Sequence, residues 1–331
     1  MERAYPGLAI LNIDNLSVDY VSPANGGSVH ALDRVSLGVN QGEVLGIVGE
    51  SGCGKSTLAF SILRLLSSPP AKISGHINFD GSDLLSLNEK DLRKIRGNRI
   101  SMVFQDSMSS LNPSQKIGDQ IAEPLKIHQK ATNSKAREYV LEVLRRVDMP
   151  MPEVVAESYP YELSGGMRQR ASIATALITN PSIIVADEPT SSLDVTIQAQ
   201  VIGLFSSLKK NFNTTLILIT HELGVAAAIC DRIAVMYAGK VAEIGSADDI
   251  FYRPLHPYTL GLMNATPRIG RQELRPIPGD VHSSTVDGSG CVFRRRCFLA
   301  SDICSTSPPA LREIGIDHLS ACHYAERVQK V

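Results

Sequence analysis

The chain has 331 residues, of which 43% are hydrophobic and 20% charged, and its formal net charge at pH 7 is −1. This composition is that of an ordinary globular protein long enough for two domains, without the basic excess of a nucleic-acid-binding chain. The longest apolar runs, such as SIIVA and TLILIT, are far shorter than the roughly 18 residues that a membrane helix needs. The N-terminus also lacks the layout of a secretion signal, so we expect a cytosolic protein, and any membrane role would have to work through partners.

A strand, a glycine-rich loop and a helix come first along the chain. EVLGIVG is an apolar run of strand type, GESGCGKST fits the pattern Gly-x4-Gly-Lys-Ser, and TLAFSILRLL has helical periodicity. The glycines let backbone N–H groups point at a phosphate, and the helix adds its positive dipole end. The sequence therefore predicts an ATP phosphate site formed by Gly49, Ser51, Gly52, Cys53, Gly54, Lys55, Ser56 and Thr57.

Two side chains of this loop have predicted chemical roles. Lys55 would reach the β- and γ-phosphates, and the hydroxyl of Ser56 would take one position on the bridging Mg²⁺. Thr57 would lie beside Ser56 in the first helical turn.

A helical insertion is expected from roughly Asp106 to Asn180, because IGDQIAEPLKIH and KAREYVLEVLRRV carry apolar residues at helical spacing. Inside it, Ser164, Gly165 and Gly166 open a helix whose N-terminus is a second anion site. One nucleotide cannot occupy two distant phosphate sites in one subunit. We therefore predict a head-to-tail dimer, in which this helix contacts the γ-phosphate bound to the partner's loop.

Two later strands end in groups suited to hydrolysis. IIVADE delivers Asp187, which would hold Mg²⁺ through water, and Glu188, which would be the base for the attacking water. TLILIT is followed by His221, which can hydrogen-bond the γ-phosphate and hold the water in line.

In order and spacing, these motifs resemble those of the ATPase subunits of ABC transporters, from about Leu11 to the C-terminus. The resemblance implies an α/β P-loop core with a mixed sheet, flanking helices and an antiparallel β subdomain. It also implies that Tyr20 stacks on adenine, and that Gln105 contacts Mg²⁺, takes part in catalysis and links the site to a membrane subunit. The expected ATPase domain covers residues 1–255, with the helical subdomain at about 106–180, and a C-terminal extension covers residues 256–331.

Two further tracts resemble the oligopeptide/dipeptide importers within that family. These are LSGGMRQR, with Met167 where most of the family has glutamine, and HPYT at His256 to Thr259. The resemblance implies peptide import at the cytoplasmic face of the bacterial inner membrane, with a sister ATPase, two permease subunits and an extracytoplasmic binding protein. Nickel, glutathione or short sugars are alternative cargoes, and a soluble ATPase of the superfamily or an iron-sulfur sensor is an alternative function.

Four of the six cysteines lie in the last 41 residues: Cys291, Cys297, Cys304 and Cys322. Four thiolates in a short, weakly hydrophobic segment imply a metal site. Their spacing lacks the close pairs usual for zinc and resembles the motif that binds a four-iron four-sulfur (4Fe-4S) cluster in dipeptide-type importer ATPases. Zinc and free thiols remain alternatives, and the run Arg294 to Arg296 predicts a solvated basic face.

Overall fold

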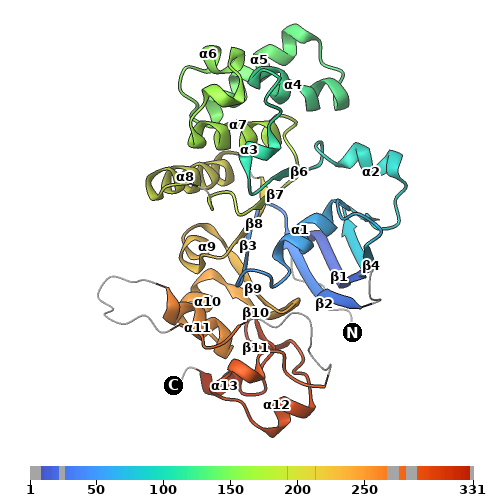
Figure 1. The fold of residues 1–331 in the computed structure, drawn as a ribbon, viewed down its shortest axis with the longest axis vertical. Helices are drawn as coiled ribbons and strands as arrows, with labels where there is room; N and C mark the ends of the chain where they lie inside the picture. Colours follow the sequence, from blue (N-terminus) through green and yellow to red (C-terminus); the bar gives the residue numbers. More distant parts are fainter. Residues whose placement is uncertain are drawn as a thin grey trace. The chain divides into compact units, whose positions relative to one another are not determined.

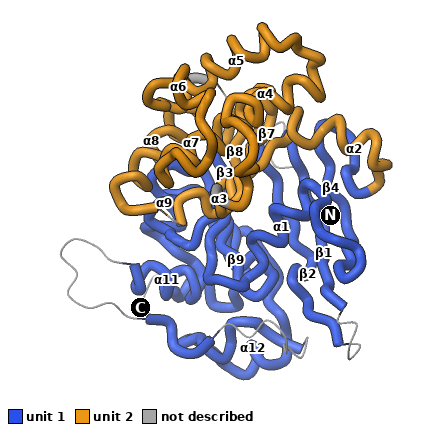
Figure 2. The backbone as a smooth tube through the Cα atoms, turned by 45° about the horizontal axis from the view of Figure 1, so that its top comes forward, with its two compact units in different colours: residues 1–40, 44–85, 219–331 blue, residues 41–43, 86–218 orange. Residues whose placement is uncertain are grey.

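The computed structural model describes residues 9–21, 27–191, 193–212, 214–266, 276–280 and 289–328. The chain forms two compact units, drawn in different colours in Figure 2. Unit 1 consists of Met1–Asn40, Val44–Leu85 and Ile219–Val331, and unit 2 of Gln41–Glu43 and Ser86–Leu218.

An antiparallel sheet of four strands forms the N-terminal part of unit 1. Its order is β2-β1-β4-β5, made by β1 (Ala9–Val21), β2 (Ser28–Asn40), β4 (Ala71–Phe79) and β5 (Ser82–Asp83). In β1 the buried side chains Leu11 and Ile13 are followed by Leu16 and Val18, so the alternation slips by one residue. The structure absorbs this slip at Asn15, where the strand register shifts and φ is 49°.

The second sheet of unit 1 is mixed. Strand β3 (Val44–Val48) pairs in parallel with β9 (Arg232–Tyr237), and β9 pairs antiparallel with β10 (Lys240–Ser246). Every residue of β3 is buried, as a parallel strand covered on both faces requires. The helices of this unit are α1 (Lys55–Ile62), α9 (Leu223–Ile229), α10 (Ala247–Tyr252), α11 (Pro257–Ala265), α12 (Asp302–Thr306) and α13 (Ala325–Val328).

The C-terminal segment extends this same sheet (Figure 1). Strand β12 (His318–Ser320) pairs with β10, and β11 (Arg312–Gly315) pairs with β12. The buried carboxylate of Glu243 in β10 contacts His318 Nε2 at 2.7 Å and accepts the backbone N–H of Leu255 at 2.7 Å. A buried carboxylate with these partners joins the segment firmly to the strand.

Unit 2 contains the strands β6 (Ile100–Val103) and β7 (Ile183–Asp187), which are parallel, and most of β8 (Thr215–Thr220). The helices of unit 2 are α2 (Glu89–Ile95), α3 (Ser107–Ser110), α4 (Ile117–His128), α5 (Asn133–Arg146), α6 (Pro152–Glu157), α7 (Gly165–Leu177) and α8 (Val195–Phe212). In the part of unit 2 where the sequence predicted a helical subdomain, α4 packs against three other helices, α5, α6 and α7.

The mixed sheet, the flanking helices and the antiparallel subdomain confirm the predicted fold class. Among the residues that the structure describes, no helix has both the length and the apolar character that crossing a membrane requires.

Candidate functional site

The glycine-rich loop of unit 1 runs from Gly49, directly after β3, to Gly54, which is the N-cap of α1. A Cβ atom at Gly49 would lie 2.3 Å from the carbonyl oxygen of Met236, and one at Gly54 would lie 2.6 Å from that of Ala31. Gly54 also has a left-handed backbone, with φ of 104°. Because main-chain oxygens cannot move aside as a flexible side chain can, both positions require glycine.

Lys55 lies in the first turn of α1 and points back into the loop. Its ammonium group donates to the carbonyl oxygens of Gly49 at 2.8 Å and Glu50 at 3.0 Å, and the residue is 5% exposed. Ser56 and Thr57 follow and are half-buried. The structure thus holds a positive charge within the loop, at the positive end of a helix.

Cys53 is the fully buried member of the loop, whereas Ser51 and Gly52 are exposed. Burial raises the pKa of the Cys53 thiol, so its side chain is a neutral filler. A contact to phosphate at this position would come from its backbone N–H.

Two other predicted residues of unit 1 occupy strand ends. Tyr20 is half-buried near the end of β1, and two residues before it Val18 pairs with Leu32 of β2. Leu32 packs against the loop, because its Cδ2 atom would lie 2.9 Å from a Cβ at Gly54. Tyr20 is therefore two residues along β1 from a strand pair that contacts the phosphate loop. His221 is exposed directly after β8.

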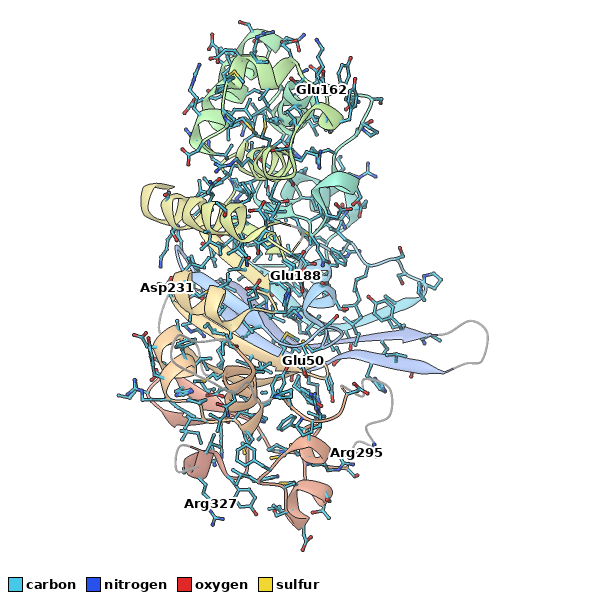
Figure 3. The ribbon with its side chains drawn as sticks, turned by 60° about the vertical axis from the view of Figure 1, so that its left-hand side comes forward. Glu50, Glu162, Glu188, Asp231, Arg295 and Arg327 are labelled. Carbon is cyan, nitrogen blue, oxygen red and sulfur yellow. The ribbon has the colours of Figure 1, made fainter. Side chains whose placement is uncertain are left out.

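In unit 2 the structure brings Gln105 and Glu188 together. Gln105 Nε2 donates to Glu188 Oε2 at 3.2 Å, while the neighbouring Asp187, at the end of β7, is 2% exposed. Glu188, labelled in Figure 3, has φ of 44°, a conformation that costs a non-glycine residue about 1–3 kcal/mol. A strained acidic residue just after a buried strand is typical of a catalytic position.

The helix predicted to start at Ser164 is α7. Ser164 is its N-cap and accepts the N–H of Met167 at 3.3 Å, and Ser164 is exposed. A Cβ at Gly166 would lie 2.8 Å from Ile197, whereas the nearest described side chain to a Cβ at Gly165 would be Leu193, at 3.9 Å. Packing within the described residues therefore explains a small residue at Gly166 and not at Gly165.

The four C-terminal cysteines line one cavity, together with apolar side chains that include Phe293 and Leu299. Sequence spacing predicted that they act together, and the fold places them around a common space. None of the four forms a disulfide with another described cysteine.

Three of these sulfurs accept a hydrogen bond from the backbone N–H of the residue two positions further along the chain. Cys297 Sγ accepts the N–H of Leu299, and Cys322 Sγ that of Tyr324, each at 3.3 Å and two residues on. Cys291 accepts from Phe293 in the same manner. The hydroxyl of Ser301 lies 3.8 Å from Cys304 Sγ.

Burial gives three of these cysteines, Cys291, Cys297 and Cys322, thiol pKa values above the ordinary range. Desolvation is the largest cause, and together with the neighbouring cysteines it raises the pKa of Cys297 to about 12 and that of Cys322 to about 11. Backbone N–H donors aimed at three of the four sulfurs would stabilise thiolates held by a bound cation. Within the described part of the chain, no group of three or more His, Cys, Asp or Glu residues has the geometry to hold a single metal ion.

Sequence reasoning missed a contact between the loop and the C-terminal part of the chain. In it, Tyr258 and Arg296 both bind the loop residue Glu50. HPYT was noticed only as a tract, and Glu50 occupies a variable position of the loop pattern. His256 of that tract is the N-cap of α11, because its Nδ1 accepts the N–H of Tyr258 at 3.1 Å. Burial lowers the pKa of His256 to about 4, which keeps the ring neutral and able to accept.

Comparison with known proteins places the chain in a class. A family model described as "ABC transporter" matches residues 32–191, and one described as "Oligopeptide/dipeptide transporter, C-terminal region" matches residues 242–304. A dimeric ATP-binding cassette, solved in a post-hydrolysis state with ADP and phosphate, superposes with a TM-score of 0.64 at 30% sequence identity. That match covers 72% of this chain and 98% of the other.

Several relatives match over nearly their whole length. A probable peptide ABC transporter ATP-binding protein of Sinorhizobium fredii is 50% identical, with 90% of each chain covered. The oligopeptide transport ATP-binding protein of Escherichia coli is 45% identical over 95% of this chain and 93% of that one. The dipeptide transport ATP-binding protein of Bacillus subtilis is 47% identical over 91% and 90%. The chain therefore belongs to the ABC transporter family, as one of its ATP-binding, ATP-hydrolysing subunits.

Proposed function

We propose that this protein hydrolyses ATP to drive the import of peptides through partner permease subunits, at the cytoplasmic face of the bacterial inner membrane. The carrying observation is that three relatives named for peptide, oligopeptide or dipeptide transport share 45–50% of their residues with this chain over at least 90% of its length. The match to the oligopeptide/dipeptide C-terminal region supports the same substrate class.

The proposed ATP site takes its parts from the residues already described. The loop Gly49, Ser51, Gly52, Cys53, Gly54, Lys55, Ser56 and Thr57 binds the phosphates, and Tyr20 stacks on adenine. Ser56, Gln105 and Asp187 hold Mg²⁺, Glu188 activates the attacking water, and His221 aligns it. The bond from Gln105 to Glu188 supports this assignment, because it joins the base to a proposed Mg²⁺ ligand.

A second subunit completes this site in our proposal. Ser164, Gly165 and Gly166 of one subunit contact the γ-phosphate bound to the other, and a distinct sister ATPase is the partner we favour. The free space at Gly165 supports this arrangement, since nothing among the described residues of its own chain requires glycine there.

We further propose a 4Fe-4S cluster on Cys291, Cys297, Cys304 and Cys322. All four line one cavity. Among the described residues, however, no three of these sulfurs lie close enough to a common point to bind one zinc ion, where each Zn–S bond is about 2.3 Å. A cluster gives each cysteine its own iron, so the sulfurs stand further apart, and N–H donors to the sulfurs are typical of such sites. When bound, the group would supply redox activity and a cross-link in a small core.

Transport is tested by uptake of labelled dipeptide, oligopeptide, glutathione, nickel and a short sugar into cells that lack the gene and carry either wild-type protein or Lys55→Ala. We expect peptide uptake only with the wild-type protein. Uptake of nickel or sugar instead of peptide would contradict the cargo assignment. Isolation from detergent-solubilised membranes should recover two permeases and a sister ATPase, whereas ribosomal or DNA-bound companions would reject transport.

The cluster is tested on protein prepared anaerobically. We expect broad visible absorbance and acid-labile sulfide, both lost in Cys304→Ser and retained in Cys230→Ser, which changes a buried cysteine outside the cavity. One zinc ion per chain without sulfide would favour the zinc alternative, and absence of both would leave free thiols.

A further inference from the structure

An ion pair joins the phosphate loop to the cysteine-rich segment, and both partners belong to unit 1. Arg296 Nη1 donates to Glu50 Oε2 at 2.7 Å, and Arg296 Nη2 donates to Glu50 Oε1 at 3.0 Å. The Arg296 side chain is only 6% exposed. Two parallel, largely buried N–H···O bonds are the strongest form of this contact, and they fix direction as well as distance.

Arg296 differs from the solvated face that the run of three arginines predicts. Arg295 is exposed, at the outer edge of its segment in Figure 3, and agrees with that prediction. Arg296 turns inward instead, because its Nε donates to the carbonyl oxygen of Pro278 at 2.8 Å and its Nη atoms donate to the carboxylate of Glu50. Its neighbour Cys297 lines the cysteine cavity.

The main chain of Glu50 is held from the same side. Its N–H donates to the hydroxyl of Tyr258 at 2.8 Å, and Tyr258 is fully buried. The Tyr258 ring lies edge-on to Tyr237 at 4.7 Å between centroids, and 5.4 Å from Phe293. Phe293 itself lines the cysteine cavity, so a continuous packed path leads from the cavity to the loop.

The charge of Glu50 explains why this contact matters for ATP. Glu50 is the second residue of the phosphate loop, so its carboxylate would add a negative charge beside a triphosphate and repel it. Arg296 neutralises that carboxylate and also restrains the loop. Because the contact is largely buried, salt screens it weakly.

We propose that Arg296 is a positioning residue for ATP: it cancels the charge of Glu50 and fixes the phosphate loop, so that nucleotide affinity depends on the structure of the cysteine-rich segment. This inference rests on the proposed ATP site. Arg296 acts through Glu50 and does not itself contact the nucleotide. By linkage, ATP bound in the loop stabilises the cysteine-rich segment by the same factor.

The test is steady-state ATP hydrolysis and equilibrium MgATP binding by the purified chain and its variants. Arg296→Gln should raise the Kd and KM for MgATP about tenfold, within the usual range of coupling between sites, and change kcat less than about twofold. Arg295→Gln, the same change one residue earlier, should alter neither value. Arg296→Lys should fall between, because it keeps the charge and loses the fork.

A second variant separates charge positioning from simple packing. Glu50→Gln combined with Arg296→Gln removes the carboxylate that Arg296 no longer neutralises, so it should restore most of the MgATP affinity. A purely structural role predicts that the double variant is at least as weak as Arg296→Gln. That result, or an unchanged Kd in Arg296→Gln, would overturn the proposal.

The reciprocal effect is measured by hydrogen exchange of the amides from Cys291 to Leu299. MgATP should slow exchange several-fold in the wild-type protein and not in Arg296→Gln. Equal protection in both would reject the linkage. If the wild-type protein fails to bind ATP, the proposed function fails; if it binds and Arg296→Gln binds equally well, only this inference fails.

Discussion

Helix α1 directly follows Gly54 and helix α7 starts with Gly165, and the surroundings of these two helix starts differ. At α1 the preceding glycines are fixed by their own chain: carbonyl oxygens leave no space for a Cβ at Gly49 or Gly54, and Lys55 is buried in the loop. At α7 the cap is the side chain of Ser164, which is exposed, and Gly165 has free space around it.

The difference separates two reasons for a glycine. The loop before α1 needs glycine to fold, whether or not a nucleotide is bound. Packing among the described residues does not require glycine at position 165, so we attribute a need for glycine there to a group outside the chain. The comparison therefore yields its own tests, because substitution should damage folding at one helix start and only function at the other.

The largest effect is expected from Glu188→Gln, which leaves both helix starts intact and removes the proposed base. Turnover should fall by about 10²–10⁴, while the Kd for MgATP stays within a few-fold. With hydrolysis blocked, the nucleotide should hold the α7 start of one subunit on the loop of the other. The measurement is size exclusion of the variant mixed with its sister ATPase, where a stable ATP-dependent dimer is expected, and full turnover would show that Glu188 is not the base.

Lys55→Ala tests the helix start that is complete within its chain. Removing a charged donor from a buried loop should weaken MgATP binding about 100-fold, which corresponds to about 2.8 kcal/mol at about 1.4 kcal/mol per factor of ten. Calorimetric titration measures this loss, and the apoprotein should also unfold at a lower temperature, because the carbonyl oxygens of Gly49 and Glu50 lose the Lys55 ammonium donor. Unchanged affinity would reject the loop as the phosphate site.

The sequence was sufficient for the fold class and for the local form of both helix starts. Glycine, lysine and serine at fixed spacing demand a strand, a loop and a helix, and β3 and α1 are found there. The sequence also predicted one metal site on the four cysteines: the structure places all four around one cavity, and the metal site itself stays a prediction.

Long-range partners were not predictable in the same way. Glu50 and Arg296 lie 246 residues apart, and no local pattern pairs them. Arg294, Arg295 and Arg296 are identical residues in one run, yet tertiary packing gives each a different environment. Arg294 donates to the carbonyl oxygen of Cys291, Arg295 is exposed, and Arg296 pairs with Glu50. The strained backbone of Glu188 likewise has no signature in sequence, since any residue can follow a strand.

Gly165→Ala tests the helix start that we propose to be completed by a partner. The structure leaves space for the added methyl group, so the free energy of unfolding should change by less than about 0.5 kcal/mol. ATPase activity should nevertheless fall about tenfold, because the methyl group would occupy space needed by the partner's γ-phosphate. Wild-type activity in this variant would remove the argument that Gly165 faces a nucleotide.

Gly203→Ala gives the smallest expected effect and is the matched control. Gly203 is exposed inside α8, and apart from the adjoining backbone of its own helix no atom of the described residues lies within 4 Å of the position of its Cβ. Alanine there should raise the free energy of unfolding by about 0.5–1 kcal/mol, because glycine is a poor helix former, and ATPase activity should not change. Both glycines are helical and have space for a methyl group in this chain. A loss of turnover confined to Gly165→Ala would therefore have to come from a contact outside the subunit, whereas equal activity of both variants would show that α7 begins with no such contact.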